Sequence, residues 1–259
     1  MIIAQNLIKS FGDQRVIKDI SITFHKGKTN LVIGRSGSGK TVLLKMLVGL
    51  MKPDSGKILY DGEDFTELDK KELLALRMKV GMLFQGSALF DSMTVEENIR
   101  FPMDMFTHST RLEKQKRVDY CLDRVGLAGN NKKYPSEVSG GMQKRVGIAR
   151  AIVLNPMYLF CDEPNSGLDP KTALLIDDLI HSITVENDIT TIINTHDMNS
   201  VMEIGESVSF LNNGQLAWQG TKNEILKSPN EDLHDFIFAS PFLQKLLDEA
   251  NMTPGDLNQ

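Results

Sequence analysis

The stretch Gly34–Thr41, which reads GRSGSGKT, decides the fold of this chain. It fits the pattern G-x-x-x-x-G-K-[S/T], follows the apolar run Thr29 to Ile33 and precedes the helix-like run Val42 to Leu50. A strand, a tight glycine turn and a helix start in this order fold backbone N–H groups around an anion, and the helix dipole adds positive charge. Lys40 would neutralise phosphate charge, and the Thr41 hydroxyl suits Mg²⁺. The stretch therefore predicts a phosphate-binding loop.

A second motif, YLFCDE, ends in two acidic residues. The apolar run Met157 to Cys161 leads into Asp162 and Glu163, as in a central parallel strand whose carboxyl end delivers acids to a crevice. Taken alone, the pattern also fits a strand that runs into a solvated turn. Combined with the phosphate loop, it predicts that Asp162 holds Mg²⁺ through water. Glu163 points differently and would polarise the attacking water.

Two further features fit phosphate chemistry only in this context. The stretch Ser139–Gln143, SGGMQ, opens a helix-like run, and its exposed N–H groups suit phosphate, although the same pattern is also a common helix cap. His196 follows the β-branched run Thr190 to Thr195, which only Asn194 interrupts, and so lies at a strand's carboxyl end. A lone histidine is often a core or surface residue. Its place beside the expected crevice favours a functional role.

In this order the motifs resemble those of ABC-type ATPases, the nucleotide-binding subunits of ATP-driven transporters, over about residues 1–220. The resemblance implies that Gln85 forms the Q-loop, that Ser166–Asp169 is the D-loop and that His196 is the switch histidine. Phe11 would stack on adenine, although a single Phe near a strand end also fits a core residue. Asn165 departs from the family, which often has Thr at this position.

The resemblance also implies a homodimer that closes head to tail on two ATP molecules, each with Mg²⁺, so that every ATP contacts the signature of the opposite subunit. It assigns catalysis to Lys40, Gln85, Glu163 and His196. It assigns nucleotide contacts to Phe11, Gly34, Arg35, Ser36, Gly37, Ser38, Gly39, Lys40, Thr41 and Val42, and to the signature residues Ser139, Gly140, Gly141 and Gln143. It assigns the metal to Thr41, Gln85 and Asp162. The family often has a second Thr at Val42, which carries no phosphate chemistry.

The hydrophobic periods predict an α/β fold, and the resemblance to ABC ATPases implies a P-loop NTPase core with a β-rich edge subdomain and an inserted helical subdomain. Residues 2–24, 56–60 and 80–84 read as strands, and residues 94–125 turn helical. We expect an ABC ATPase domain at 1–220, with the helical subdomain at about 86–150, and a C-terminal helical extension at 221–259. The apolar residues of this extension need a partner, which is either their own domain or the other protomer, as in Mla-type ATPases.

The stretch Phe84–Pro102, FQGSALFDSMTVEENIRFP, resembles the ATPases of Mla-type phospholipid transporters, which work with Mce-domain proteins. This likeness implies an integral-membrane permease that docks near Gln85–Pro102. It also implies phospholipid movement between the membranes of a Gram-negative-type envelope, with an Mce-domain protein as a further partner. An apolar patch here equally fits internal packing. The alternatives are a transporter of amino acids, lipoproteins or metals, or a soluble regulatory ABC protein, which usually has tandem domains or coiled coils.

Composition agrees with a soluble protein of a reducing cytoplasm, and the resemblance implies a peripheral location on the cytoplasmic face of the inner membrane. The chain has 259 residues, 41% of them hydrophobic, and a net charge of −5, which weighs against a nucleic-acid partner. Its two cysteines form no disulfide framework or metal cluster. We expect no signal peptide and no membrane span. The sequence does not specify the substrate, the direction of transport or an extra regulatory subunit, because the ATPase is not expected to contact the cargo.

Overall fold

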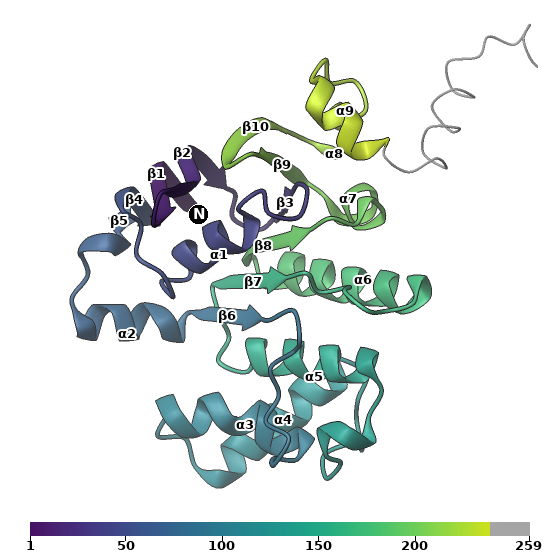
Figure 1. The fold of residues 1–259 in the computed structure, drawn as a ribbon. Coiled ribbons are helices and arrows are strands. Elements are labelled where there is room, and N and C mark those ends of the chain that lie inside the picture. The colour runs from purple at the N-terminus through teal and green to yellow at the C-terminus, as the bar shows by residue number, and fades with distance from the viewer. Residues whose placement is uncertain (239–259) are drawn as a thin grey trace, which may run out of the picture.

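The computed structural model describes residues 1–238 and builds them around two β-sheets (Figure 1). The larger sheet has the strand order β10-β9-β3-β8-β7-β6, in which only the edge strand β10 runs antiparallel to its neighbour. Its strands are β3 (Thr29–Ile33), β6 (Val80–Leu83), β7 (Tyr158–Asp162), β8 (Thr190–Thr195), β9 (Ser207–Asn212) and β10 (Gln215–Gly220). The smaller, antiparallel sheet has the order β2-β1-β4-β5, with β1 (Ile2–Phe11), β2 (Gln14–Phe24), β4 (Ser55–Tyr60) and β5 (Glu63–Asp64).

The helices connect the strands of both sheets and cover the larger one. They are α1 (Lys40–Leu47), α2 (Lys70–Met78), α3 (Val95–Phe106), α4 (Arg111–Arg124), α5 (Gly140–Ile152), α6 (Pro170–Glu186), α7 (Met198–Ile204), α8 (Lys222–Ile225) and α9 (Glu231–Ile237), with short 3-10 turns η1 (Phe65–Glu67) and η2 (Pro135–Glu137). The predicted helical stretch 94–125 is two helices. Each begins at its own capping box, Thr94 with Glu97 and Thr110 with Glu113.

Alternation along the buried strands divides the core into two parts. In β3, Leu31 and Ile33 belong to a cluster with α5, α6 and α7, whereas Val32 belongs to a cluster with α1 and the antiparallel sheet. Because successive side chains of a strand point to opposite faces, a fully apolar strand packs on both sides. Helix α1 is therefore enclosed between the two sheets, and α3 and α4 lie at the far end of the molecule from the antiparallel sheet (Figure 1).

The predicted fold class is confirmed: the antiparallel sheet is the β-rich edge, and α3 and α4 are the inserted helices. Sequence periodicity missed α2, because this helix has no buried residue and its short apolar face, with Leu73 and Leu76, is only half-buried. Its start at a capping box, formed by Asp69 and Glu72, is the signal that could have found it. None of the helices within residues 1–238 has both the length and the apolar character that crossing a membrane requires.

The first part of the C-terminal extension packs on its own domain. Ile225, Leu233 and Ile237 are buried in the same core cluster as α7 and β9. The ring of Phe236 lies 5.4 Å from that of Phe210, measured between ring centroids. Residues 221–238 thus pack on their own domain, which is one of the two expected alternatives. The predicted helical segment with Phe242, Leu243, Leu246 and Leu247 lies outside the described residues, and its contact with a second protomer stays a prediction.

Candidate nucleotide-binding site

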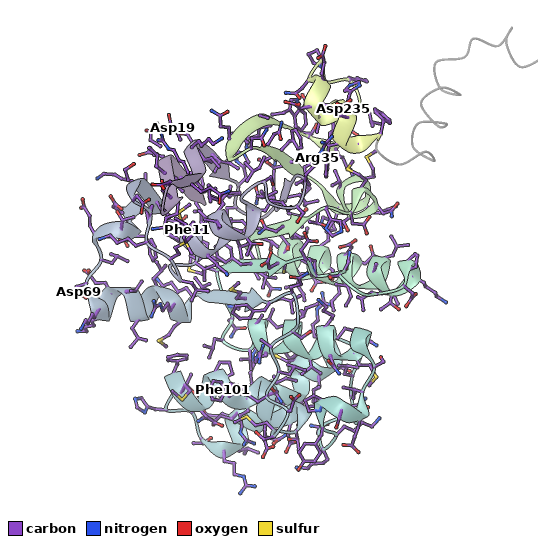
Figure 2. The ribbon with its side chains drawn as sticks, viewed as in Figure 1. Phe11, Asp19, Arg35, Asp69, Phe101 and Asp235 are labelled. Carbon is purple, nitrogen blue, oxygen red and sulfur yellow. The ribbon has the colours of Figure 1, made fainter. Side chains whose placement is uncertain are left out.

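The phosphate loop connects the buried strand β3 to the start of α1 and is held by close backbone packing. A side chain at Gly34 would overlap the carbonyl oxygen of Leu211, and Gly39 has a φ of 105°, a conformation that favours glycine. Arg35, labelled in Figure 2, is exposed together with Ser36 and Gly37. The loop therefore presents its middle residues outward while its glycines allow the tight turn.

The side chain of Lys40 lies inside the loop and is only 7% exposed. Its Nζ donates to the carbonyl oxygens of Gly34 (2.8 Å) and Arg35 (3.2 Å). Burial lowers the pKa of Lys40 below its ordinary value, and the nearby carboxylates of Glu163 and Asp162 oppose this shift. A cation held in this way can neutralise the charge of a bound phosphate group.

The residues around the loop fit a nucleotide phosphate with Mg²⁺. The buried Ser38 Oγ has no hydrogen-bond partner within residues 1–238, so it is free for a ligand. Thr41 Oγ1 lies 3.4 Å from Asp162 Oδ1, and a hydroxyl beside a carboxylate supplies the oxygen ligands that Mg²⁺ prefers. Thr41 and Asp162 would hold the metal, and Lys40 would contact the phosphates.

The two acidic residues at the end of β7 point to different partners, as the sequence predicted. Asp162 is 8% exposed, and Asn194 Nδ2 donates to its Oδ1 (3.2 Å). Glu163 has a φ of 49°, unusual for a residue with a side chain, and its N–H donates to the Asn194 carbonyl (2.9 Å). Glu163 Oε2 lies 2.8 Å from His196 Nδ1. The carboxyl ends of β7 and β8 thus bring Asp162, Glu163 and His196 together.

Gln85 follows strand β6 and is exposed at the same edge of the sheet. Its Nε2 lies 3.4 Å from Ser166 Oγ, at hydrogen-bond distance from the D-loop motif. The structure therefore places the Q-loop and D-loop motifs beside each other. The assignment of Gln85 to the metal stays a prediction.

The signature stretch begins α5 and does not join this cluster. Ser139 caps the helix by accepting from Met142 N–H (3.3 Å), and Ser139 and Gly140 are exposed. Gln143 Nε2 donates to the carbonyl oxygen of Pro135 (2.9 Å), which holds the loop before the helix. Among the described residues, Ser139 to Gly141 form no hydrogen bond to the phosphate loop. The motif is thus an exposed helix start within the subunit.

Phe11 ends strand β1 and is 47% exposed, so it is not the core residue that its sequence context also allowed. Lys9 Nζ lies 5.8 Å from the centroid of its ring. A Cβ on Gly39 would lie 3.3 Å from the carbonyl oxygen of Val16 in β2, so the β1–β2 hairpin that carries Phe11 contacts the phosphate loop. An exposed ring on this hairpin is available for a base. Val42 packs instead against the core around α1.

Sequence reasoning missed two polar residues of the site. Asn194 contacts Asp162 with its side chain and Glu163 with its carbonyl oxygen, and its interruption of a β-branched run was the available signal. Lys144, only 5% exposed, donates to the carbonyl oxygens of Gln85 and Glu163 (3.4 Å to the latter). Lysines are rarely buried, so nothing in the local sequence indicated this role. The fold and the site together define a P-loop nucleotide-binding domain.

Comparisons with known proteins identify its family. The sequence matches the family described as "ABC transporter" over residues 17–166. It is 40% identical over 231 residues to "Probable ribonucleotide transport ATP-binding protein mkl" of Mycobacterium tuberculosis, an alignment that covers 89% of this chain and 64% of that protein. It is 41% identical over 232 residues to "Methionine import ATP-binding protein MetN" of Carboxydothermus hydrogenoformans, covering 88% and 68%. The chain thus spans less than two thirds of the mycobacterial relative.

Solved structures give the same result. The dimeric ATP-binding cassette MJ0796 bound to ADP and Pi has a TM-score of 0.78 at 30% identity, covering 86% of this chain and 99% of that one. The cassette cbiO1 of Clostridium perfringens, part of the transporter complex cbiONQ, has a TM-score of 0.82 at 29% identity, covering 95% and 98%. The chain belongs to the ABC transporter family, in which it is an ATP-binding cassette.

Proposed function

We propose that this protein hydrolyses ATP as a homodimer and thereby drives a membrane transporter. The observation that carries the proposal is the cluster at the carboxyl edge of the sheet, where Lys40, Thr41 and Asp162 lie beside the Glu163–His196 pair. The signature helix start at Ser139–Gly141 makes no hydrogen bond to this cluster's phosphate loop in the described part of the chain. A second subunit would supply it, and the dimer of the similar cassette MJ0796 supports this arrangement.

In the proposed mechanism each residue acts on a different part of the reaction. Lys40 and the exposed N–H groups at Ser139–Gly141 of the opposite subunit stabilise charge on the transferred phosphoryl group. Glu163 orients the attacking water, and His196 holds the Glu163 carboxylate through the 2.8 Å contact. Mg²⁺, when bound at Thr41 and Asp162, would neutralise phosphate charge. Gln85 would report the state of the site to the adjoining loop, and Phe11 would support the adenine ring.

The role of Glu163 is tested by steady-state ATP hydrolysis and by ATP binding. Glu163→Gln should bind ATP with wild-type affinity and lose turnover by at least about a hundredfold, as expected for a general base. Glu203→Gln, which changes an exposed carboxylate on α7, is the matched control and should hydrolyse ATP at the wild-type rate. Retained turnover in Glu163→Gln would remove the proposed role.

The permease would dock on the aromatic surface formed by Phe84, Phe90 and Phe101. Phe84 and Phe90 are 38% and 41% exposed, and the rings of Phe90 and Phe101 lie 4.8 Å apart between centroids. The buried Asn98 holds this loop: it accepts from Phe90 N–H (2.8 Å) and donates to the carbonyl oxygens of Phe90 and Met93 (3.1 Å each). An aromatic pair with one exposed and one half-buried ring, a few residues after Gln85 in the chain, suits a short helix of a membrane subunit.

For the cargo we propose phospholipid, carried with an Mce-domain partner at the cytoplasmic face of an inner membrane. The support is the likeness of the stretch Phe84–Pro102 to Mla-type ATPases. The names of the relatives point instead to ribonucleotide transport or methionine import as second candidates. None of these cargoes is expected to contact the cassette, so neither Lys40 nor the aromatic surface discriminates among them.

The partner is identified by affinity purification of the tagged Glu163→Gln protein from its own cells in mild detergent with ATP. Recovery of a permease, an Mce-domain protein and phospholipid would support lipid transport, and Phe90→Ala should reduce the recovered permease. Tyr134→Ala, which changes an exposed aromatic residue outside the aromatic surface, is the control. A permease with a methionine-binding or nucleotide-binding partner would replace the phospholipid assignment, and recovery of only soluble partners would remove the transporter.

A further inference from the structure

Behind the Glu163 turn lies a buried polar cluster formed by Asn165, Asp177 and Ser200. Asn165 Nδ2 donates to Asp177 Oδ2 and to Ser200 Oγ, each at 2.9 Å. Asp177 and Ser200 are each 1% exposed. Both hydrogens of the Asn165 amide are therefore used, and the three side chains join three segments: the turn after β7, helix α6 and helix α7.

The cluster lies between the segments that carry two proposed catalytic residues. Asn165 is two residues after Glu163, and Ser200 is four residues after His196 in the short helix α7. Asp177, in the middle of α6, faces both. The segments that carry Glu163 and His196 are thus connected twice. The first connection is the 2.8 Å contact between Glu163 Oε2 and His196 Nδ1, and the second is the buried cluster, whose side chains do not hydrogen-bond to the phosphate loop in the described residues.

A role in packing alone does not explain these residues. Apolar side chains of the same size would fill the space without the cost of burying a carboxylate, and no salt bridge reaches Asp177 from a basic side chain in the described residues. Asp177 Oδ1 and Asn165 Oδ1 are buried without a hydrogen-bond partner. Burial raises the pKa of Asp177 to about 6, and Asp197 and Asp178 add to this shift. A buried polar contact that costs free energy at this place indicates that the relative orientation of the three segments matters, because hydrogen bonds fix orientation and apolar packing does not.

We propose that Asn165, Asp177 and Ser200 are positioning residues of the ATPase. They hold the turn that carries Glu163 and the helix that follows His196 in one arrangement. The Glu163 carboxylate and the His196 imidazole are therefore already at contact distance before the reaction begins. This inference rests on the proposed function of Glu163. Because the cluster orients catalytic groups and does not contact ATP, its loss should lower kcat and leave the KM for ATP unchanged.

The test compares kcat, KM and the melting temperature of four variants with wild type. Asp177→Leu removes the acceptor and Ser200→Ala removes the hydroxyl, and each should lower kcat by about tenfold with KM within twofold, the size expected for one lost buried hydrogen bond. The double variant should be no slower than Asp177→Leu, because both changes break the same connection. Asp177→Asn keeps an acceptor for Asn165 Nδ2, so it should retain the wild-type kcat at pH 8.

Wild-type kcat in Asp177→Leu and Ser200→Ala, while Glu163→Gln is inactive, would overturn the inference and leave the proposed function standing. A wild-type protein without ATP hydrolysis would instead overturn the proposed function. A kcat loss that merely follows the unfolded fraction seen in the melting curves would also overturn the inference. If Asp177→Leu does not fold, Ser200→Ala decides, because it removes only one oxygen atom.

Discussion

Replacing the buried carboxylate of Asp177 by an amide should stabilise the protein, and more so as the pH rises. Asp177 is 1% exposed, and its hydrogen-bond partners, Asn165 and Ser200, are neutral. Burial raises its pKa from the ordinary 3.8 to about 6. The folded protein therefore binds this proton more tightly than the unfolded chain does. The stabilisation is fully present below pH 3.8 and is lost as the pH rises through about 6.

The size of the effect follows from the shift. A difference of about two pKa units corresponds to about 3 kcal/mol in the free energy of unfolding, and about half of it is lost between pH 5 and pH 8. Asp177→Asn cannot ionise, and its amide oxygen can still accept from Asn165 Nδ2. The variant should therefore exceed wild type by an amount that grows by about 1.5 kcal/mol from pH 5 to pH 8.

The assay is urea unfolding followed by far-UV circular dichroism at pH 5, 6, 7 and 8. Glu203→Gln, which changes an exposed carboxylate on α7 that does not contribute to the Asp177 shift, is the matched control, and its unfolding free energy should run parallel to that of wild type. Parallel curves for wild type and Asp177→Asn over the whole range would refute the reasoning, because they would mean that Asp177 titrates alike in the folded and unfolded chains.

Three further predictions concern other parts of the molecule. Lys144→Met fills the volume of a side chain that is 5% exposed but leaves the carbonyl oxygens of Gln85 and Glu163 without their donor. We expect the free energy of unfolding to fall by about 1–3 kcal/mol and ATP hydrolysis to slow. An unchanged melting curve would contradict this. Tyr158→Phe removes the 2.5 Å hydrogen bond to Asp61 Oδ2 and should cost about 1–2 kcal/mol, and a wild-type urea midpoint would disprove it. Deletion of Ser240–Gln259 should reduce the dimer content measured without nucleotide by analytical ultracentrifugation, and unchanged content would exclude a contact of this segment with the other protomer.

Much of the site was predictable because its parts are local in sequence. The glycine spacing of Gly34–Thr41 between a strand and a helix specifies a loop around phosphate wherever the rest of the chain lies. Asp162 and Glu163 follow an apolar run and His196 follows a β-branched one, and parallel strands bring their carboxyl ends to one edge. The structure has these residues side by side at that edge, and their roles in catalysis and metal binding stay predictions.

The exposure of Phe11 and the local folding of the first part of the C-terminal extension were not decided by the sequence. Phe11 fitted either an exposed ring or a core residue, since a strand end permits both. The extension could pack on its own domain or on a second protomer, since the apolar spacing of Leu233 and Ile237 indicates only that these side chains need an apolar surface to cover them. The contacts that resolved both cases join residues far apart in the chain.

The sequence by itself determined the fold class, the phosphate loop, the acidic strand end and the order of the motifs, because short spacings and hydrophobic periods act locally. Only the tertiary structure decided that Lys144 is buried between two loops, that Asn194 contacts both Asp162 and Glu163, and that Asn165 meets Asp177 and Ser200. Polar residues such as these are usually exposed, and whether one is buried depends on the packing of distant elements, which no local pattern records.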